Sequence, residues 1–358
     1  MAKQPSNDMI FVGCDDGHDS IKVVTRSLTD KTEASKLTMP SKVARGSRAI
    51  SLTGEGAQSG VYEAGSEVFT VTDAMVGSDL INTRTLNYPV SDVNRVLVHD
   101  SLIRAGLSGK DVRLVTGLPV QDYYRDGAAN LELIELKKAN LADKAIHPKA
   151  ATPLANIISQ SVACEGVAAV YDMAINDDGS DNVDFFRMLE AGRYVGVIDI
   201  GGKTIDLAVV YLDRGQPQVA MSLTRSIDFG MLRIAEQIRK EIQIKYKIDD
   251  ISPRAMARVM SHRTMSLYGQ EQSMQNEIAT AIAKVTPDLF DRIRDIWGTV
   301  MHELATVISV GGGTYLMKDP IKEGLLSQLE SRDEPEYANA RGMLKMGMRS
   351  YIQSQEQA

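Results

Sequence analysis

The sequence predicts an α/β protein made of two related halves. Segments with the apolar patterns of strands and of helices alternate along the chain, which is typical of sheets covered by helices. An apolar strand, an acidic residue, a glycine turn and a second strand follow one another twice, around Asp15 and around Asp199. The chain of 358 residues is also longer than one hydrophobic core usually supports.

The expected elements of the first half are strands in 9–17, 19–27 and 34–44, a small inserted subdomain in about 45–90, a helix in 91–107, a strand in 111–120, a short strand running into a charged turn in 130–141, and a strand followed by a helix in 154–175. Asp92 is a candidate N-cap of the helix in 91–107.

The expected elements of the second half are a strand–turn–strand segment in 194–212, a helix in 228–246, a helical region from Ser273 to Leu304, a strand, glycine turn and helix start in 306–317, and a helix in 334–353. Pro287 is expected to break its helical region into two helices. The last helix is expected to form despite Gly342 and Gly347.

The composition argues against several classes of protein. The formal net charge is −7 at pH 7, whereas a non-specific nucleic-acid binder needs a basic surface. No apolar run approaches the length that crosses a bilayer. The polar segment 1–8 lacks the apolar core of a signal peptide, and we expect it to be a short disordered tail. We therefore expect a cytoplasmic protein that contacts neither membrane nor nucleic acid directly.

Cysteine and histidine form no recognisable metal-binding or redox motif in the sequence. Cys14 and Cys164 do not make a CxxC pair, and the five histidines show no HExxH spacing. We expect both cysteines to be free thiols in a reducing compartment and to serve as packing residues.

The segment YVGVIDIGGKTIDLAVVYL, residues 194–212, poses the main functional question, because Gly-Lys-Thr also ends a P-loop. A P-loop requires G-x-x-x-x-G-K-[ST]. If Gly202 were its second glycine, the first would have to be residue 197, which is valine, so the motif is absent. A P-loop also requires a helix after the turn, but 204–212 is β-branched and apolar, as in a strand. The residues therefore indicate a hairpin with Lys203 at its tip.

A glycine hairpin of this kind can bind phosphate, because glycine lets backbone N–H groups approach phosphate oxygens. Asp199, at the end of the first strand, is placed to hold Mg²⁺ through water. Taken alone, a plain hairpin is the simpler interpretation, since Gly-Gly is an ordinary turn signal.

Three further features favour the phosphate site. The segment from Asp15 to Lys22 repeats the design, and Lys22 lies seven residues after Asp15, where its side chain can reach back toward phosphate. Glu165 stands at a probable strand end before a helix of small residues. A third glycine turn, 311–313, opens a helix where a nucleoside can lie against bare backbone.

In this order the motifs resemble the superfamily of actin, the sugar kinases and the heat-shock chaperone ATPases. Within it the chain is most similar to the ParM family of actin-like ATPases, which segregate bacterial plasmids. The segments that carry the likeness, nearly along the whole chain, are DDGHDSIK, SDVNRVLVHDSLIRAGL, LPVQDYY, KKAN, IDIGGKTIDL, VGGGTYL and YANARGMLKMG.

The resemblance implies the actin-like ATPase fold, an α/β fold with two related domains flanking a nucleotide cleft. Each domain would have a mixed β-sheet and surrounding helices. The expected limits are 1–190 for domain I with its inserted subdomain, 191–333 for domain II, and 334–358 for a C-terminal helix that returns to domain I.

The resemblance also implies roles for individual residues. Asp15 and Asp199 would organise the water shell of Mg²⁺ beneath the phosphates of ATP, with GTP left open as the nucleotide. Glu165 would position or activate the attacking water, which with Asp15 and Asp199 completes the catalytic set. The residues expected to contact the nucleotide are Asp16, Gly17, His18, Lys22, Gly201, Gly202, Lys203, Thr204, Gly311, Gly312 and Gly313.

The first hairpin departs from the family pattern at His18, Asp19 and Ser20, which replace small hydroxyl residues. A carboxylate that pointed inward would repel phosphate, so we expect Asp19 to face away or to cap the turn. In the second hairpin Lys203 stands where the family commonly has threonine.

The function implied is that of an ATPase that polymerises with ATP, hydrolyses it and depolymerises. Its partners would be further copies of itself and a ParR-type DNA-binding adaptor at a plasmid centromere, which suits a chain too acidic to hold DNA. An alternative is a small-molecule, sugar-type kinase of the same superfamily, although no second acidic cluster clearly supplies its catalytic base. A chaperone-type ATPase would require a further peptide-binding domain.

Overall fold

The computed structural model describes residues 9–28, 34–47, 60–73, 80–143, 146–150 and 152–356. The chain divides into two compact units, one made of Met1–Met188 with Glu336–Ala358 and the other of Leu189–Pro335. The expected tail at 1–8 lies outside the described residues, as do 48–59 and 74–79 of the expected inserted subdomain.

The first unit contains a mixed main sheet and a smaller antiparallel sheet. The strands of the main sheet lie in the order β11 (Asn156–Cys164), β7 (Asp111–Leu118), β1 (Ile10–Asp16), β2 (Ser20–Ser27) and β3 (Ser35–Pro40). Those of the smaller sheet lie in the order β10 (Ile146–Pro148), β5 (Val61–Ala64), β6 (Glu67–Val71) and β4 (Val43–Arg45), so β5 and β6 lie in the inserted segment.

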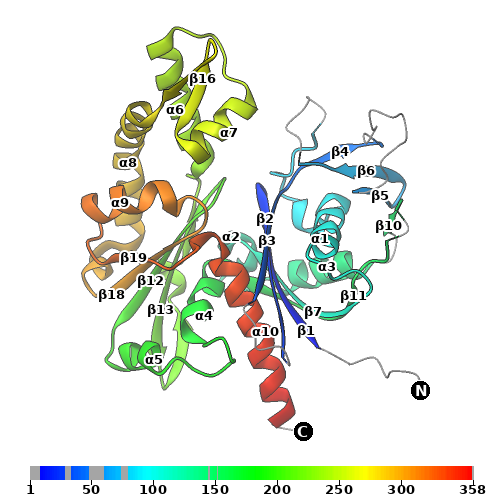
Figure 1. The fold of residues 1–358 in the computed structure, drawn as a ribbon. Coiled ribbons are helices and arrows are strands. Elements are labelled where there is room, and N and C mark those ends of the chain that lie inside the picture. Colours follow the sequence, from blue (N-terminus) through cyan, green and yellow to red (C-terminus); the bar gives the residue numbers. More distant parts are fainter. Residues whose placement is uncertain are drawn as a thin grey trace. The chain divides into compact units, whose positions relative to one another are not determined.

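Helices cover both faces of the main sheet of the first unit. They are α1 (Asp92–Arg104), α2 (Val120–Tyr123), α3 (Leu131–Ala142), α4 (Val167–Ala174) and α10 (Ala338–Glu356), while α5 (Val183–Glu190) crosses into the second unit in sequence. Figure 1 shows this sheet between α10 on one face and α1 on the other.

Alternation along β1 decides which helices its acidic residues meet. Phe11 packs against α10, whereas Val12 packs in the core beside α1. Because successive side chains of a strand point to opposite faces, Asp15 belongs to the α10 face and Asp16 to the α1 face.

The second unit contains a mixed sheet in the order β14 (Gln216–Val219), β13 (Ile205–Asp213), β12 (Tyr194–Ile200), β18 (Leu304–Val310) and β19 (Leu329–Ser331), with β15 (Arg225–Ile227) paired to β13. Its helices are α6 (Met231–Tyr246), α7 (Pro253–His262), α8 (Gln275–Trp297) and α9 (Thr314–Gly324), and a hairpin of β16 (Thr264–Leu267) and β17 (Gln270–Ser273) lies between α7 and α8 in sequence.

The two main sheets share one topology, which confirms the prediction of two related halves. In each, a hairpin is followed on one side by an antiparallel strand and on the other by two parallel strands. Thus β1, β2, β7 and β11 correspond to β12, β13, β18 and β19. The turns also match, because four residues, 17–20 and 201–204, separate the last paired residues of each hairpin.

The prediction of a strand in 130–141 is wrong, since this segment is helix α3. Asn130 caps the helix by accepting a hydrogen bond from the Leu133 N–H. The buried positions, Ile134, Lys137 and Leu141, recur every three or four residues as in a helix. A lysine in the buried stripe hid that period from sequence reasoning.

The predicted break at Pro287 is also wrong, because α8 runs through it without interruption. Buried apolar residues lie at helical spacing on both sides, with Ile278 and Ile282 before the proline and Leu289 and Ile293 after it. Their shared burial against one core outweighs the hydrogen bond that proline removes.

Two other expectations are confirmed. The last helix forms as α10 despite its glycines, and at Gly342 a Cβ would lie 1.7 Å from the carbonyl oxygen of Ala168, so only glycine allows α10 this close to α4. Cys14 and Cys164 are buried free thiols. Among the described residues, no helix combines the length and apolar character needed to span a membrane.

Candidate phosphate-binding hairpins

The hairpin of β1 and β2 places an acid and a base side by side. Asp15 and Lys22 are direct partners across the two strands, with Lys22 Nζ 3.5 Å from Asp15 Oδ2. Asp15 is only 6% exposed. Burial raises the pKa of the Asp15 carboxyl above its usual range, and the Lys22 ammonium opposes that shift. Lys22 Nζ also lies 4.0 Å from where a Cβ of Gly17 would be, so its charge is at the turn.

The turn of this hairpin directs its carbonyl groups to one side. Ser41 Oγ donates to the Gly17 carbonyl at 2.6 Å, and Thr83 Oγ1 donates to the His18 carbonyl at 2.6 Å. The peptide bonds of the described residues are trans, so each N–H points opposite to the preceding C=O. The N–H group of His18 therefore points away from Ser41, and that of Asp19 points away from Thr83.

The side chains that depart from the family pattern have partners beside the turn. His18 Nδ1 lies 2.7 Å from the Thr83 carbonyl oxygen, and its ring lies 4.9 Å from that of Tyr88. Arg84 donates to the Asp19 carboxylate at 3.2 Å. The extra negative charge is thus paired with an arginine.

The hairpin of β12 and β13 repeats the arrangement with different partners, and its existence in place of a strand–helix P-loop is confirmed. The first N–H groups of α6, those of Met231 and Leu232, donate to the carbonyls of Gly201 and Gly202 at 3.0 and 2.9 Å. The N–H groups of Gly202 and Lys203 consequently point away from α6. The equivalent turn positions, Gly202 with His18 and Lys203 with Asp19, thus present their amides in the same way.

Helix α6 approaches this turn closely because Gly230 precedes it. A Cβ at Gly230 would lie 2.5 Å from the Gly202 carbonyl oxygen. The Gly201 N–H donates to the Thr204 carbonyl at 3.0 Å, which closes the turn internally. The amides of Gly202 and Lys203, rather than that of Gly201, are therefore directed outward.

Asp206 is a functional candidate that sequence reasoning missed. It is the direct cross-strand partner of Asp199, and the two carboxylates are 4% and 6% exposed. Ser226 donates a hydrogen bond to Asp206. Asp206 lies seven residues after Asp199, as Lys22 lies seven after Asp15, so applying the same spacing to the second hairpin would have found it.

The glycine turn after β18 packs on the end of β12. A Cβ at Gly311 would lie 2.4 Å from Asp199 Oδ1, and one at Gly313 would lie 2.2 Å from Ile200 Cγ2. A Cβ at Gly312 would meet nothing within 4 Å. Gly311 and Gly313 are thus required by packing within the unit, while Gly312 borders open space.

Glu165 follows the end of β11, beside the end of β7. Its N–H donates to the Leu118 carbonyl at 2.8 Å, and its carboxylate lies over Gly117, where a Cβ would be 2.7 Å from Oε1. Because β1, β7 and β11 are parallel neighbours, Asp15 and Glu165 both stand at the carboxyl end of this sheet. Ligands of α/β proteins bind at this end of parallel strands.

The Asp16 carboxylate does not face the turn. It accepts hydrogen bonds from Lys137 Nζ at 2.7 and 2.9 Å on the other face of the sheet. Asp16 can therefore line the hairpin only with its backbone.

The donor set suits Mg²⁺ held largely by water. Within the described ranges, no three or more acidic, histidine or cysteine side chains form a group that could hold a metal ion. Mg²⁺ usually takes one or two carboxylates and several waters, so Asp199 beside Asp206, or Asp15 alone, fits that preference.

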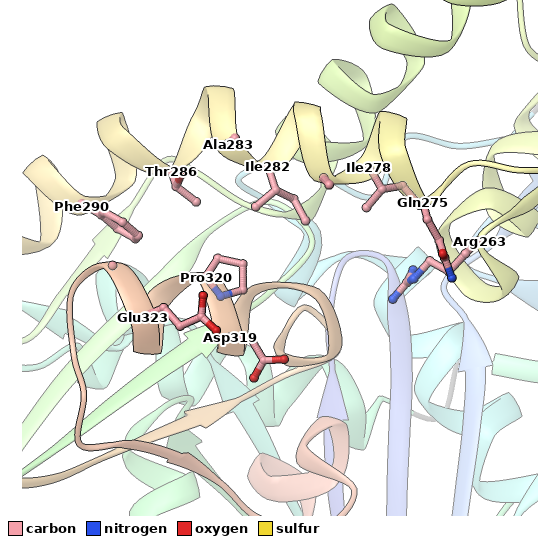
Figure 2. A pocket seen from close by; sticks show the side chains of 12 residues that line it. Arg263, Gln275, Ile278, Ile282, Ala283, Thr286, Phe290, Asp319, Pro320 and Glu323 are labelled. Carbon is pink, nitrogen blue, oxygen red and sulfur yellow. The ribbon is translucent and has the colours of Figure 1, made fainter.

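A groove of about 680 Å³ lies elsewhere in the second unit, between α8 and α9. Figure 2 shows Ile282 and Phe290 of α8 facing Pro320, with Asp319 and Glu323 on the α9 side. None of the predicted site residues lines this groove.

Two family models match the chain. The N-terminal model of the plasmid segregation protein ParM matches residues 10–176. The C-terminal model of the archaeal actin homologue MreB-like family matches residues 197–323. No curated protein sequence matches.

Solved structures match the chain over nearly its whole length. The archaeal actin homologue Ta0583 aligns with a TM-score of 0.72 at 18% identity, covering 95% of this chain and 100% of that one. A non-polymerisable pCBH ParM mutant aligns with a TM-score of 0.71 at 16% identity, covering 95% and 99%. The actin-like protein Alp7A aligns with a TM-score of 0.74 at 13% identity, covering 98% of each chain.

The chain therefore has the actin-like fold, with two units of the same topology and a glycine hairpin in each. Residues 10–176 match the N-terminal model of the ParM family, which confirms the resemblance predicted from the motifs.

Proposed function

We propose that the chain is a Mg²⁺-dependent ATPase that assembles into filaments when it binds ATP. The observation that carries the proposal is the pair of equal hairpins, each with a buried acid at the end of its first strand and two turn amides that point one way. An archaeal actin homologue of the same fold has been solved in complex with ADP, which supports a nucleotide as the ligand.

In this proposal the turn amides of His18, Asp19, Gly202 and Lys203 bind phosphate oxygens, and Lys22 adds a positive charge beside the first turn. Asp15 and Asp199 accept hydrogen bonds from the waters around Mg²⁺. The bound ion would neutralise charge on the phosphates and orient them.

The nucleoside would lie against the glycine turn 311–313. Gly312 is the position of this turn that faces open space. Thr204 closes the second hairpin through its carbonyl, so its contribution is to the shape of the turn.

Glu165 is the proposed catalytic residue that orients the attacking water. Its carboxylate stands at the carboxyl end of the parallel strands of the first unit, near the end of β1. Phosphoryl transfer needs chiefly positioning and charge stabilisation, so one carboxylate that holds water is sufficient chemistry.

Self-assembly is supported by the similar structures, which include a 15-stranded ParM filament from Clostridium botulinum. Hydrolysis changes the ligand, and a ligand with different affinities for two conformations shifts their populations and so the strength of the contacts between subunits. We propose that the filament moves plasmid DNA in the cytoplasm through a ParR-type adaptor, because a net charge of −7 disfavours direct contact with DNA.

The test is assembly of the purified chain with ATP and Mg²⁺, followed by light scattering and electron microscopy. Filaments should form with ATP and persist longer with a non-hydrolysable analogue. Glu165→Ala should slow phosphate release about 100-fold while leaving assembly intact. No filaments with either nucleotide would show that the assembly proposal is wrong, and unchanged hydrolysis in Glu165→Ala would remove Glu165 from its role.

A further inference from the structure

A buried ion pair lies directly behind the tip of the first hairpin. Lys137 of α3 is 2% exposed, and its Nζ donates to both carboxylate oxygens of Asp16 and to the Gly117 carbonyl. Asn94 Nδ2 of α1 donates to Asp16 Oδ2 at 2.6 Å. The ammonium therefore has three acceptors. The carboxylate also accepts from the Gly117 N–H of β7, so its donors come from three different elements.

A buried ion pair of this kind does not by itself indicate that the pair stabilises the fold. Removing two charges from water is costly, and well-packed apolar residues of similar size often stabilise a core as well or better. A role in fixing geometry accounts better for a lysine inside this core, provided that the geometry it fixes matters for function.

The geometry that it fixes is that of Gly117. The Gly117 N–H donates to Asp16 Oδ1 at 3.3 Å, and its carbonyl accepts from Lys137. Both polar backbone groups of this residue are thus held by the ion pair. Gly117 in turn lies under Glu165, because a Cβ at Gly117 would be 2.7 Å from Glu165 Oε1 and 2.9 Å from its Cγ.

We propose that Lys137 is a positioning residue for the hydrolysis step, acting through Asp16 and Gly117 on Glu165. Asp16 follows Asp15 in β1 and faces the opposite side of the sheet, so the pair joins the end of β1 to the peptide on which Glu165 rests. This inference rests on the proposed ATPase function. The resemblance to the ParM family includes the segment KKAN, 137–140, but implies no role for Lys137.

The first unit offers a matched control. Lys345 of α10 is also buried, and its Nζ lies 3.0 Å from Asp172 Oδ1 of α4. The partners of Lys345 Nζ are Asp172 of α4 and Asp177, whose Oδ1 lies 3.2 Å away, and they include neither Gly117 nor Glu165. Lys345→Met therefore removes a buried lysine from the same unit without removing a contact of Gly117 or Glu165.

The experiment compares Lys137→Met with Lys345→Met, measuring kcat for ATP hydrolysis and the Kd of a fluorescent ATP analogue. Lys137→Met should lower kcat about 10- to 100-fold, as small misplacements of a catalytic group do, with the Kd changed less than about threefold. Lys345→Met should change kcat less than about threefold. The double variant Asp16→Asn with Lys137→Met leaves no unpaired buried charge, and it should fold while retaining the loss of kcat.

A cycle with Glu165→Ala separates positioning from general damage. If Lys137 acts through Glu165, then adding Lys137→Met to Glu165→Ala should lower kcat by less than about twofold. An equal loss in both backgrounds, or an equal loss in Lys345→Met, would overturn the inference. A wild-type chain that hydrolyses no ATP would instead refute the proposed function, and this inference with it.

Discussion

Lys22 and Asp206 occupy the same position in the two hairpins, directly across from the acid that is the second-last residue of the first strand. Lys22 faces Asp15, and Asp206 faces Asp199. The frame is therefore the same in both units, but the local charge differs. The first hairpin pairs its acid with an ammonium at 3.5 Å, whereas the second holds two buried carboxylates side by side.

The charge difference predicts that the second hairpin governs the Mg²⁺ dependence. Asp206→Asn should raise the Mg²⁺ concentration that gives half-maximal ATP hydrolysis about tenfold or more, because groups around a metal-holding carboxylate tune metal affinity by that amount. Titration of the ATPase rate with Mg²⁺ at saturating ATP is the measurement. Ser226→Ala, which removes only the hydroxyl that donates to Asp206, should give a smaller shift in the same direction. If the Mg²⁺ concentration for half-maximal hydrolysis is unchanged in Asp206→Asn, then Asp206 does not contribute to Mg²⁺ binding.

The hairpins were predictable from sequence because their signals are local. An apolar strand, an acid and a glycine turn lie within about ten residues, and strand alternation then fixes the face on which Asp15 lies. The ion pair behind the hairpin was not predictable, since Lys137 is 121 residues and Asn94 is 78 residues from Asp16. Lys137 also misled the secondary-structure prediction by interrupting the apolar stripe of α3.

The direction of the turn amides was likewise beyond sequence reasoning. It depends on where the carbonyls find donors: Ser41 and Thr83 in the first unit and the first N–H groups of α6 in the second. These donors come from distant segments or from a helix start whose docking is set by Gly230. Residue types suggest that a glycine turn can hold an anion, but only the structure shows which amides point outward.

We expect the buried Asp15 carboxylate to lower the stability of the nucleotide-free protein while it contributes to the binding of Mg²⁺ and ATP. Burial raises the pKa of Asp15 in the folded chain, so its charged form destabilises that chain once the pH exceeds the unfolded value of about 3.9. Asp15→Asn should therefore raise the Tm of the nucleotide-free protein at pH 7, and the gain should disappear below about pH 4. The same variant should reduce the increase in Tm that Mg²⁺ and ATP produce. A lower Tm at pH 7 would contradict the expected sign.

Alanine substitution of the two adjacent glycines Gly312 and Gly313, after β18, should have different effects: one should weaken ATP binding and the other should lower stability. Gly313→Ala should destabilise the second unit by about 1–3 kcal/mol, because its Cβ would lie 2.2 Å from Ile200 Cγ2. Gly312→Ala should leave the Tm unchanged but weaken ATP binding, because its Cβ points into the space proposed for the nucleoside. Thermal unfolding and ATP titration of both variants decide the matter. Wild-type ATP affinity in Gly312→Ala would move the nucleoside away from this turn.

Of the two lysines at the hairpin turns, we expect Lys22 to bind phosphate through its side chain and Lys203 to bind it only through its backbone N–H. Lys22 Nζ lies beside Asp15 and the first turn, whereas Lys203 contributes an outward N–H that any residue other than proline would keep. Lys22→Met should weaken ATP binding about tenfold or more, since hydrogen bonds to charged groups contribute about 1.5–3 kcal/mol. Lys203→Ala should change the Kd by less than about threefold, and Lys203→Pro should weaken binding because it removes the N–H. If Lys203→Ala instead abolished binding while Lys22→Met did not, the side chain of Lys203 would be acting as a P-loop lysine does, in spite of the strand that follows it.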